Sequence, residues 1–164
     1  LEETKHLTYK IEINNILDKS ITFLRNIFQN KDVNIQLNLP NEKLFLQANE
    51  LLQDVFENIL INAVRYNESS TFEIIIKISK TEENGIKYGK MEIIDNGIGI
   101  EDVRKEKIFQ RSYTKDKNVR GMGLGLSLVY KIIKSYKGKI WVENRVIHDY
   151  SQGSNFIVLI PEVK

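Results

Sequence analysis

The chain has 164 residues, 41% of them hydrophobic and 28% charged, and its formal net charge is +2. These values fit one soluble globular domain with a substantial core and exclude a disordered chain, and the small charge does not support nucleic-acid or membrane binding. The lack of cysteine excludes a disulfide framework and a thiolate zinc site, and no apolar run approaches the ~20 residues of a membrane helix.

The start of the chain is polar and has no initiator methionine. We therefore expect a segment of a longer protein, in which residues 1–10 form the tail of a preceding element and residues 11–164 form one domain. Apolar residues from Ile13 to Phe28 recur at helical spacing and predict an amphipathic helix. Strict alternation over residues 33–39 predicts a strand that stops at Pro40.

The middle of the chain predicts a second helix followed by a hairpin. The second helix runs from Leu51 to Ala63 and carries a broad apolar stripe. Strands are expected at residues 71–79 and 91–95, with Asn84-Gly85 as the turn signal between them.

The last part of the chain predicts one more helix and two closing strands. Apolar residues from Leu124 to Tyr136 define a third helix, ended by Gly138. Strands follow at residues 140–146 and 155–160, around turn-forming residues 149–154. Three helices and about five strands, several of them consecutive, predict an α/β (α+β) two-layer sandwich in which a mixed, mainly antiparallel sheet is covered on one face by three helices.

The second predicted helix carries polar residues that could bind a ligand. Asn58 and Asn62 lie four residues apart on one helical face, and Arg65 and Tyr66 continue that stripe. Asparagine oxygens suit a magnesium ion that also binds phosphates, and an arginine can meet a phosphate oxygen. Taken alone, the same asparagines also fit a solvated helix surface.

Asp95 ends an apolar strand and is followed by turn residues. A carboxylate there can accept a hydrogen from the exocyclic amine of adenine, and Gly97 and Gly99 remove side chains where a base would approach the backbone. The alternative is an ordinary turn leaving a strand.

A second glycine cluster precedes the third helix. Gly121, Gly123 and Gly125 could cradle phosphate with free amides at the helix start, although a flexible hinge has the same composition. Residues 101–120, with seven basic and four acidic side chains, form an irregular stretch that predicts a lid, taken as residues 101–122. The positions of these glycines do not fit a Rossmann motif or a Walker-type P-loop.

Four ordered blocks resemble the N, G1, F and G2 boxes of the Bergerat-type ATPases, and most closely the catalytic ATP-binding domain of sensor histidine kinases. The blocks are residues 57–66, 95–100, 108–113 and 121–126, and residues 138–143 and 153–156 resemble later signatures of that family. The resemblance covers residues 11–161 and implies that the chain binds ATP and Mg²⁺, with Asn62 and Asn58 at the metal. It implies nucleotide contacts at Asn58, Asn62, Arg65, Tyr66, Asp95, Gly97, Gly99, Ile100, Tyr113, Arg120, Gly121, Met122, Gly123, Leu124, Gly125, Leu126 and Ser154.

Two departures from the family pattern qualify the resemblance. In the F block, Phe109 is followed by Gln110, Arg111 and Ser112 rather than by an acid and a proline, which predicts an altered lid. The acceptor histidine is absent, because His6 is followed by Leu7 and lies only fifty-two residues before Asn58. No catalytic nucleophile is therefore expected in this chain, and the phosphoryl group would pass to a histidine elsewhere.

The resemblance implies a cytoplasmic phosphoryl-donor domain whose parent can be membrane-anchored. Its expected partners are the parent's own dimerisation domain, to which residues 1–10 would lead, and a response regulator, with no nucleic acid and no membrane contact. The isolated domain is expected to be monomeric and the parent homodimeric. The alternatives are another Bergerat-type ATPase or serine kinase, or a nucleotide-sensing pseudokinase.

Overall fold

The computed structural model describes residues 7–110 and 125–163. In these residues it contains seven strands, three α-helices and two short 3₁₀ helices. In chain order they are β1 (Tyr9–Glu12), α1 (Ile13–Ile27), β2 (Val33–Asn38), β3 (Phe45–Ala48), α2 (Leu51–Arg65), β4 (Phe72–Glu83), β5 (Ile86–Asp95), η1 (Asp102–Arg104), η2 (Lys107–Phe109), α3 (Leu126–Ser135), β6 (Lys139–Val146) and β7 (Asp149–Pro161).

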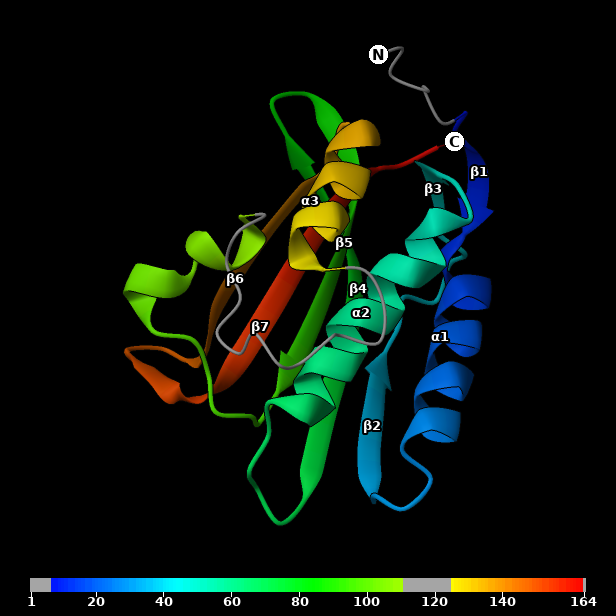
Figure 1. The fold of residues 1–164 in the computed structure, drawn as a ribbon. Helices are drawn as coiled ribbons and strands as arrows, with labels where there is room; N and C mark the ends of the chain where they lie inside the picture. Colours follow the sequence, from blue (N-terminus) through cyan, green and yellow to red (C-terminus); the bar gives the residue numbers. More distant parts are fainter. Residues whose placement is uncertain (1–6, 111–124, 164) are drawn as a thin grey trace.

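A five-stranded sheet in the order β2-β4-β5-β7-β6 forms one layer. Strand β2 pairs with β4 in parallel, and all the other neighbours in this sheet are antiparallel. The three α-helices lie over one face of the sheet, as Figure 1 shows. This arrangement confirms the predicted two-layer sandwich, and a second sheet pairs β1 with β3.

The core lies between the sheet and the helices. Every second residue of the first half of β4 is buried, namely Ile74, Ile76 and Ile78, which places one face of the strand against α2 and the other outside the core. Helix α2 contributes a nearly continuous apolar face that includes the fully buried Phe56. Within the described part of the chain, no helix has the length and apolarity needed to cross a bilayer.

The strands are longer than the sequence pattern predicts. Strands β4 and β5 continue to a two-residue turn at Asn84 and Gly85, both with positive φ (52° and 79°), so the hairpin signal is confirmed. Strand β7 begins at Asp149, directly after His148 with φ 70°, whereas residues 149–154 were expected to be a turn. Exposed and half-buried polar residues, such as those at positions 79–83 and 151–152, hide the two-residue alternation in these outer strand segments.

The chain segment that enters the domain is paired from Tyr9 onward. Strand β1 runs antiparallel to β3, and the Tyr9 hydroxyl donates to Glu50 Oε2 at 2.9 Å. On its other side β3 is joined to the C-terminal segment, where the Val163 amide donates to the Phe45 carbonyl at 2.9 Å. Strand β3 was not predicted, because four residues give too short a pattern.

Helix α3 ends in a Schellman motif whose left-handed residue is Lys137. The Gly138 amide donates to the Ile133 carbonyl at 3.0 Å, and Lys137 has φ 61°. Gly138 therefore does not supply the left-handed turn that the sequence suggested. A Cβ at Gly138 would lie 2.3 Å from the Leu159 carbonyl oxygen, so this glycine is required by close packing of the helix end on β7.

We predict that Lys137→Gly stabilises the domain. Glycine relieves about 1–2 kcal/mol of left-handed strain and loses about 0.4–1 kcal/mol through a more flexible unfolded chain. The free energy of unfolding should rise by about 0.5–1 kcal/mol in urea titrations. Gly138→Ala should lower it, and a loss of stability in Lys137→Gly would show that the lysine side chain matters more than the backbone strain.

Candidate functional site

Asp95 is a buried carboxylate at the end of β5. It is 6% exposed, and its Oδ1 accepts hydrogen bonds from the Gly97 amide at 2.8 Å and from the Ser154 amide at 3.4 Å. Burial raises the pKa of Asp95 to about 6, while the two amides and the charge of Arg145 act in the opposite direction. The carboxylate is therefore fixed in place by the backbones of the turn after β5 and of β7, and it forms no ion pair within the described part of the chain.

Three glycines allow the chain to close around Asp95. A Cβ at Gly97 would lie 2.5 Å from the Tyr66 carbonyl oxygen, and one at Gly153 would lie 2.0 Å from the Asp95 carbonyl oxygen. Gly99 has φ +75°, and its Cβ would collide with the Tyr150 carbonyl. The structure shows that Gly97 and Gly99 admit neighbouring backbone, and their contact with a base stays a prediction.

The polar face of α2 ends beside the Asp95 turn. Asn58 is buried and its Nδ2 atom has no hydrogen-bond partner among residues 7–110 and 125–163, whereas Asn62 and Arg65 are half-buried and Tyr66 is exposed. A buried amide without a partner is costly and indicates a place for a ligand or an ordered water. The Tyr66 carbonyl accepts a hydrogen bond from the Ile98 amide at 3.0 Å, which joins the helix end to the turn.

The described part of the predicted lid forms η1 and η2. Phe109 packs against Tyr130 of α3 and Phe156 of β7, with ring centroids 6.1 and 6.3 Å apart. The Ile100 carbonyl accepts a hydrogen bond from Lys105 Nζ at 2.7 Å. The beginning of the predicted lid is therefore anchored to the same face as α3.

The predicted phosphate cradle is described only at its end. Gly125 precedes α3, and its carbonyl accepts hydrogen bonds from the amides of Leu128 and Val129. Leu126 is the first residue of the helix and packs against the core. The other predicted residues of this region, namely Tyr113, Arg120, Gly121, Met122, Gly123 and Leu124, lie outside the described residues.

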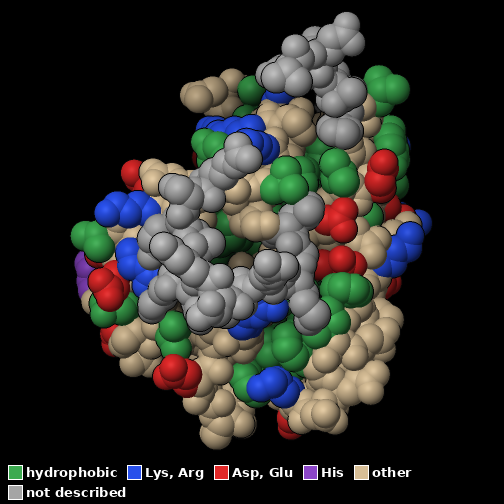
Figure 2. All heavy atoms as spheres, viewed as in Figure 1, with side chains coloured by type: hydrophobic (Ala, Val, Ile, Leu, Met, Phe, Trp, Pro, Cys, Tyr) green, Lys and Arg blue, Asp and Glu red, His purple; other side chains and the backbone are tan. Residues whose placement is uncertain are grey.

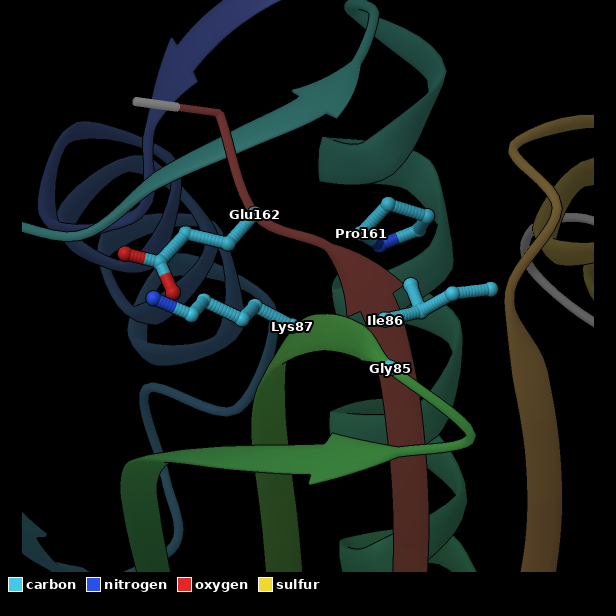
Figure 3. A pocket seen from close by; sticks show the side chains of 5 residues that line it. All are labelled: Gly85, Ile86, Lys87, Pro161 and Glu162. Atoms are coloured by element: carbon cyan, nitrogen blue, oxygen red, sulfur yellow. The ribbon is translucent and has the colours of Figure 1, made fainter.

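Figure 2 shows the helix-covered face in the view of Figure 1, with acidic and basic side chains interspersed on it. A shallow pocket, shown in Figure 3, is lined by Gly85, Ile86, Lys87, Pro161 and Glu162. It lies where β5 begins, at the opposite end of the strand from Asp95, and a ten-residue strand spans about 30 Å. The pocket of Figure 3 is therefore remote from the candidate site.

Asn67 and Asn96 form a hydrogen bond beside the candidate site that the sequence did not predict. The Asn67 Nδ2 group donates to Asn96 Oδ1 at 2.7 Å, joining the loop after α2 to the turn after β5. The two residues are 29 positions apart, so no local spacing identifies the pair. Asn96 stands inside the 95–100 block, but its side-chain partners are evident only in the fold.

Comparison with known families places most of the chain in one of them. The model described as "Histidine kinase-, DNA gyrase B-, and HSP90-like ATPase" matches residues 47–164. The chain is 33% identical over 138 residues to the adaptive-response sensory kinase SasA of Gloeothece citriformis, a match that covers 82% of this chain and 33% of that protein. It is 28% identical over 167 residues to the sensor protein kinase WalK of Staphylococcus haemolyticus, covering 97% of this chain and 26% of that protein.

Solved structures show the same fold. The nucleotide-free catalytic domain of histidine kinase ThkA superposes with a TM-score of 0.79 at 25% identity, covering 94% of this chain and 95% of that one. ThkA in complex with the response regulator TrrA gives a TM-score of 0.73 at 25% identity, covering 95% of this chain and 42% of that one. Among the first curated relatives, the chain spans only 20–34% of their length.

The ionisation of Asp95 should make the stability of the ligand-free domain depend on pH. The pKa is raised from 3.8 to about 6 in the folded chain, so the folded state binds more protons between these values. The contribution of Asp95 to the free energy of unfolding is then largest below pH 3.8 and is lost as the pH rises through 6. At pH 7 the ionised group costs on the order of 3 kcal/mol.

We predict that Asp95→Asn becomes more stable relative to the unmodified chain as the pH rises from 4.5 to 7. Urea titrations at both pH values measure this difference, which should change by about 1–3 kcal/mol. The comparison cancels the titration of all other groups. An equal difference at both pH values would contradict the raised pKa.

Proposed function

Because the chain belongs to the family of histidine kinase-, DNA gyrase B- and HSP90-like ATPases, we propose that it binds Mg-ATP and donates the γ-phosphoryl group to a histidine of a dimerisation domain. It is a histidine kinase-type ATPase domain of the sensor-kinase kind, as the similarity to SasA and the ThkA catalytic domain indicates. The acceptor histidine belongs to another part of the parent protein.

The observation that carries the proposal is the buried carboxylate of Asp95. Its Oδ1 is fixed by the Gly97 and Ser154 amides, and the pKa near 6 leaves the group ionised at neutral pH. An ionised, fixed acceptor suits the exocyclic amine of adenine, while guanine presents a carbonyl in the same place and would be repelled. In this role Ser154 acts through its backbone and its hydroxyl lies beside the base.

The α2 face supplies the phosphate end of the proposed site. Asn58 would offer its Oδ1 to a hydrated magnesium ion. Its Nδ2 group, which lacks a partner among the described residues, is a donor suited to a water of that ion or to a phosphate oxygen. Asn62 would bind the ion and Arg65 a phosphate oxygen. When bound, the ion neutralises phosphate charge, and the amides of residues 121–126 would complete the contacts.

This arrangement supports positioning rather than covalent catalysis. The protein would hold the nucleotide by its base and its phosphates and leave the γ-phosphoryl group free for an incoming acceptor. The crystal structure of ThkA in complex with TrrA supports a response regulator as the downstream partner. The parent would be a homodimer through its dimerisation domain, with this domain monomeric when isolated.

Calorimetric titration with ATP, with and without Mg²⁺, tests the nucleotide site. Asp95→Asn should raise the Kd for ATP by about ten- to a hundredfold, since a hydrogen bond to a charged group contributes about 1.5–3 kcal/mol. Asn62→Asp should alter the magnesium dependence more than adenine recognition. The matched control is Asp32→Asn, an exposed aspartate before β2 that should leave the Kd unchanged. Unaltered ATP affinity in Asp95→Asn would remove Asp95 from its role.

Phosphoryl transfer is tested with radiolabelled ATP. The isolated chain should form negligible phosphohistidine, because His6 is followed by Leu7 and His148 comes after the Asn58 block, whereas the family's acceptor precedes that block. Addition of a dimerisation domain from the parent should give acid-labile label on that domain. Robust label on the chain alone would contradict the proposal, and Mg-ATP binding without any transfer to the supplied domain would favour a nucleotide-sensing pseudokinase.

A further inference from the structure

We propose that Asn67 and Asn96 are positioning residues that hold the phosphate end of the site in register with its adenine end. The proposal deepens the proposed function and rests on it. Neither residue is among the proposed nucleotide contacts. Their effect would be exerted through Asn62 and Arg65 on one side and Asp95 on the other.

The side chain of Asn96 joins the turn after β5 to residues 67–73, which run from the end of α2 into β4. Its Oδ1 accepts hydrogen bonds from Asn67 Nδ2 at 2.7 Å and from the Glu73 amide at 3.0 Å. Its Nδ2 donates to the Thr71 carbonyl at 2.9 Å. Both ends of one amide are therefore used, on the loop after α2 and on the beginning of β4.

Asn67 completes a closed network with Ser69. Asn67 is 8% exposed, and its Oδ1 accepts a hydrogen bond from the Ser69 amide at 2.9 Å. The Ser69 hydroxyl donates to the Asn96 carbonyl at 3.0 Å. Because a buried amide that loses its partners pays the cost of desolvation, this network resists relative movement of the two segments.

The network lies between the two ends of the proposed site. Asn67 follows the helix end that carries Asn62 and Arg65, and Asn96 directly follows Asp95. The hydrogen bond from the Ile98 amide to the Tyr66 carbonyl, at 3.0 Å, adds a backbone link beside it. Displacement of the α2 end relative to Asp95 would break several of these bonds.

The spacing between the two ends of the proposed site affects affinity because ATP binds through both its adenine and its phosphates. Once adenine is bound, the affinity for the phosphates depends on the effective concentration of their binding groups, which is highest when the spacing is fixed at the correct value. Loosening the network should leave adenine binding intact and weaken the additional affinity that the phosphates provide. A general loss of folding would affect both ends together.

The test compares adenosine, which engages only the adenine end, with Mg-ATP, which engages both. Asn67→Asp keeps the acceptor for the Ser69 amide but replaces the donor that faces Asn96 Oδ1, so it removes one bond with little change in shape. Asn96→Ala removes three bonds. In both variants the Kd for adenosine should stay within about twofold, while the Kd for Mg-ATP should rise by about fivefold or more, the low end of typical coupling between sites.

Control variants distinguish a change in the geometry of the proposed site from a general loss of stability. Ile160→Val removes one methylene group from the core at the far end of β7 and should leave the ratio of the two Kd values unchanged. The double variant Asn67→Ala with Asn96→Ala should lose less than the sum of the single changes, because the two residues share the hydrogen bond between them. If Asn96→Ala fails to fold, the exposed Ser69→Ala, which removes one bond of the network, gives the same comparison.

The outcomes of these titrations distinguish a failure of the positioning role from a failure of the proposed function. An unchanged ratio in Asn67→Asp and Ser69→Ala, or an equal loss for adenosine and Mg-ATP, would overturn the positioning role while leaving the proposed function in place. If the unmodified chain bound Mg-ATP no more tightly than adenosine, the proposed function itself would fail, and the positioning role with it.

Discussion

The proposed site depends on a carboxylate that is buried at the point where three backbone segments meet. Asp95 is buried without an ion-pair partner among the described residues, so its charge relies on the Gly97 and Ser154 amides and on the more distant Arg145. The amides can reach it because Gly97 and Gly153 carry no side chain. A Cβ at either glycine would push the end of α2 or the start of β7 away from the carboxylate.

Helix α2 connects the turn at Asp95 to the hydrophobic core. Its apolar face includes Phe56 and Ile59, both fully buried, so its rotation about its own axis is fixed by packing against the sheet. The same packing fixes the opposite stripe, on which Asn58 and Asn62 lie one turn apart. The network of Asn67 and Asn96 then fixes the helix end against the Asp95 turn, so core packing and site geometry are determined together.

The sequence was sufficient for the long elements, whereas the nucleotide contacts that it suggests stay predictions. The three helices follow from apolar periodicity, and the Asn84-Gly85 turn from two residues that accept positive φ. What could not be predicted depends on contacts between distant segments. The pairing of β1 with β3 and the bond from Asn67 to Asn96 join residues 29 or more positions apart, and nothing in the local pattern around either residue marks its partner.

The left-handed residue at the end of α3 is a second feature that the local sequence pattern could not predict. Glycine is favoured in that conformation, so a helix followed by Gly138 suggests that the glycine takes it. In the fold Lys137 takes it instead, because Gly138 is needed one position later, where the chain passes within contact distance of the Leu159 carbonyl. One glycine cannot supply both the left-handed residue at position 137 and the missing side chain at position 138. Close packing against β7 places it at 138, because the clash of a Cβ at that position would cost more free energy than the strain of Lys137 with φ 61°.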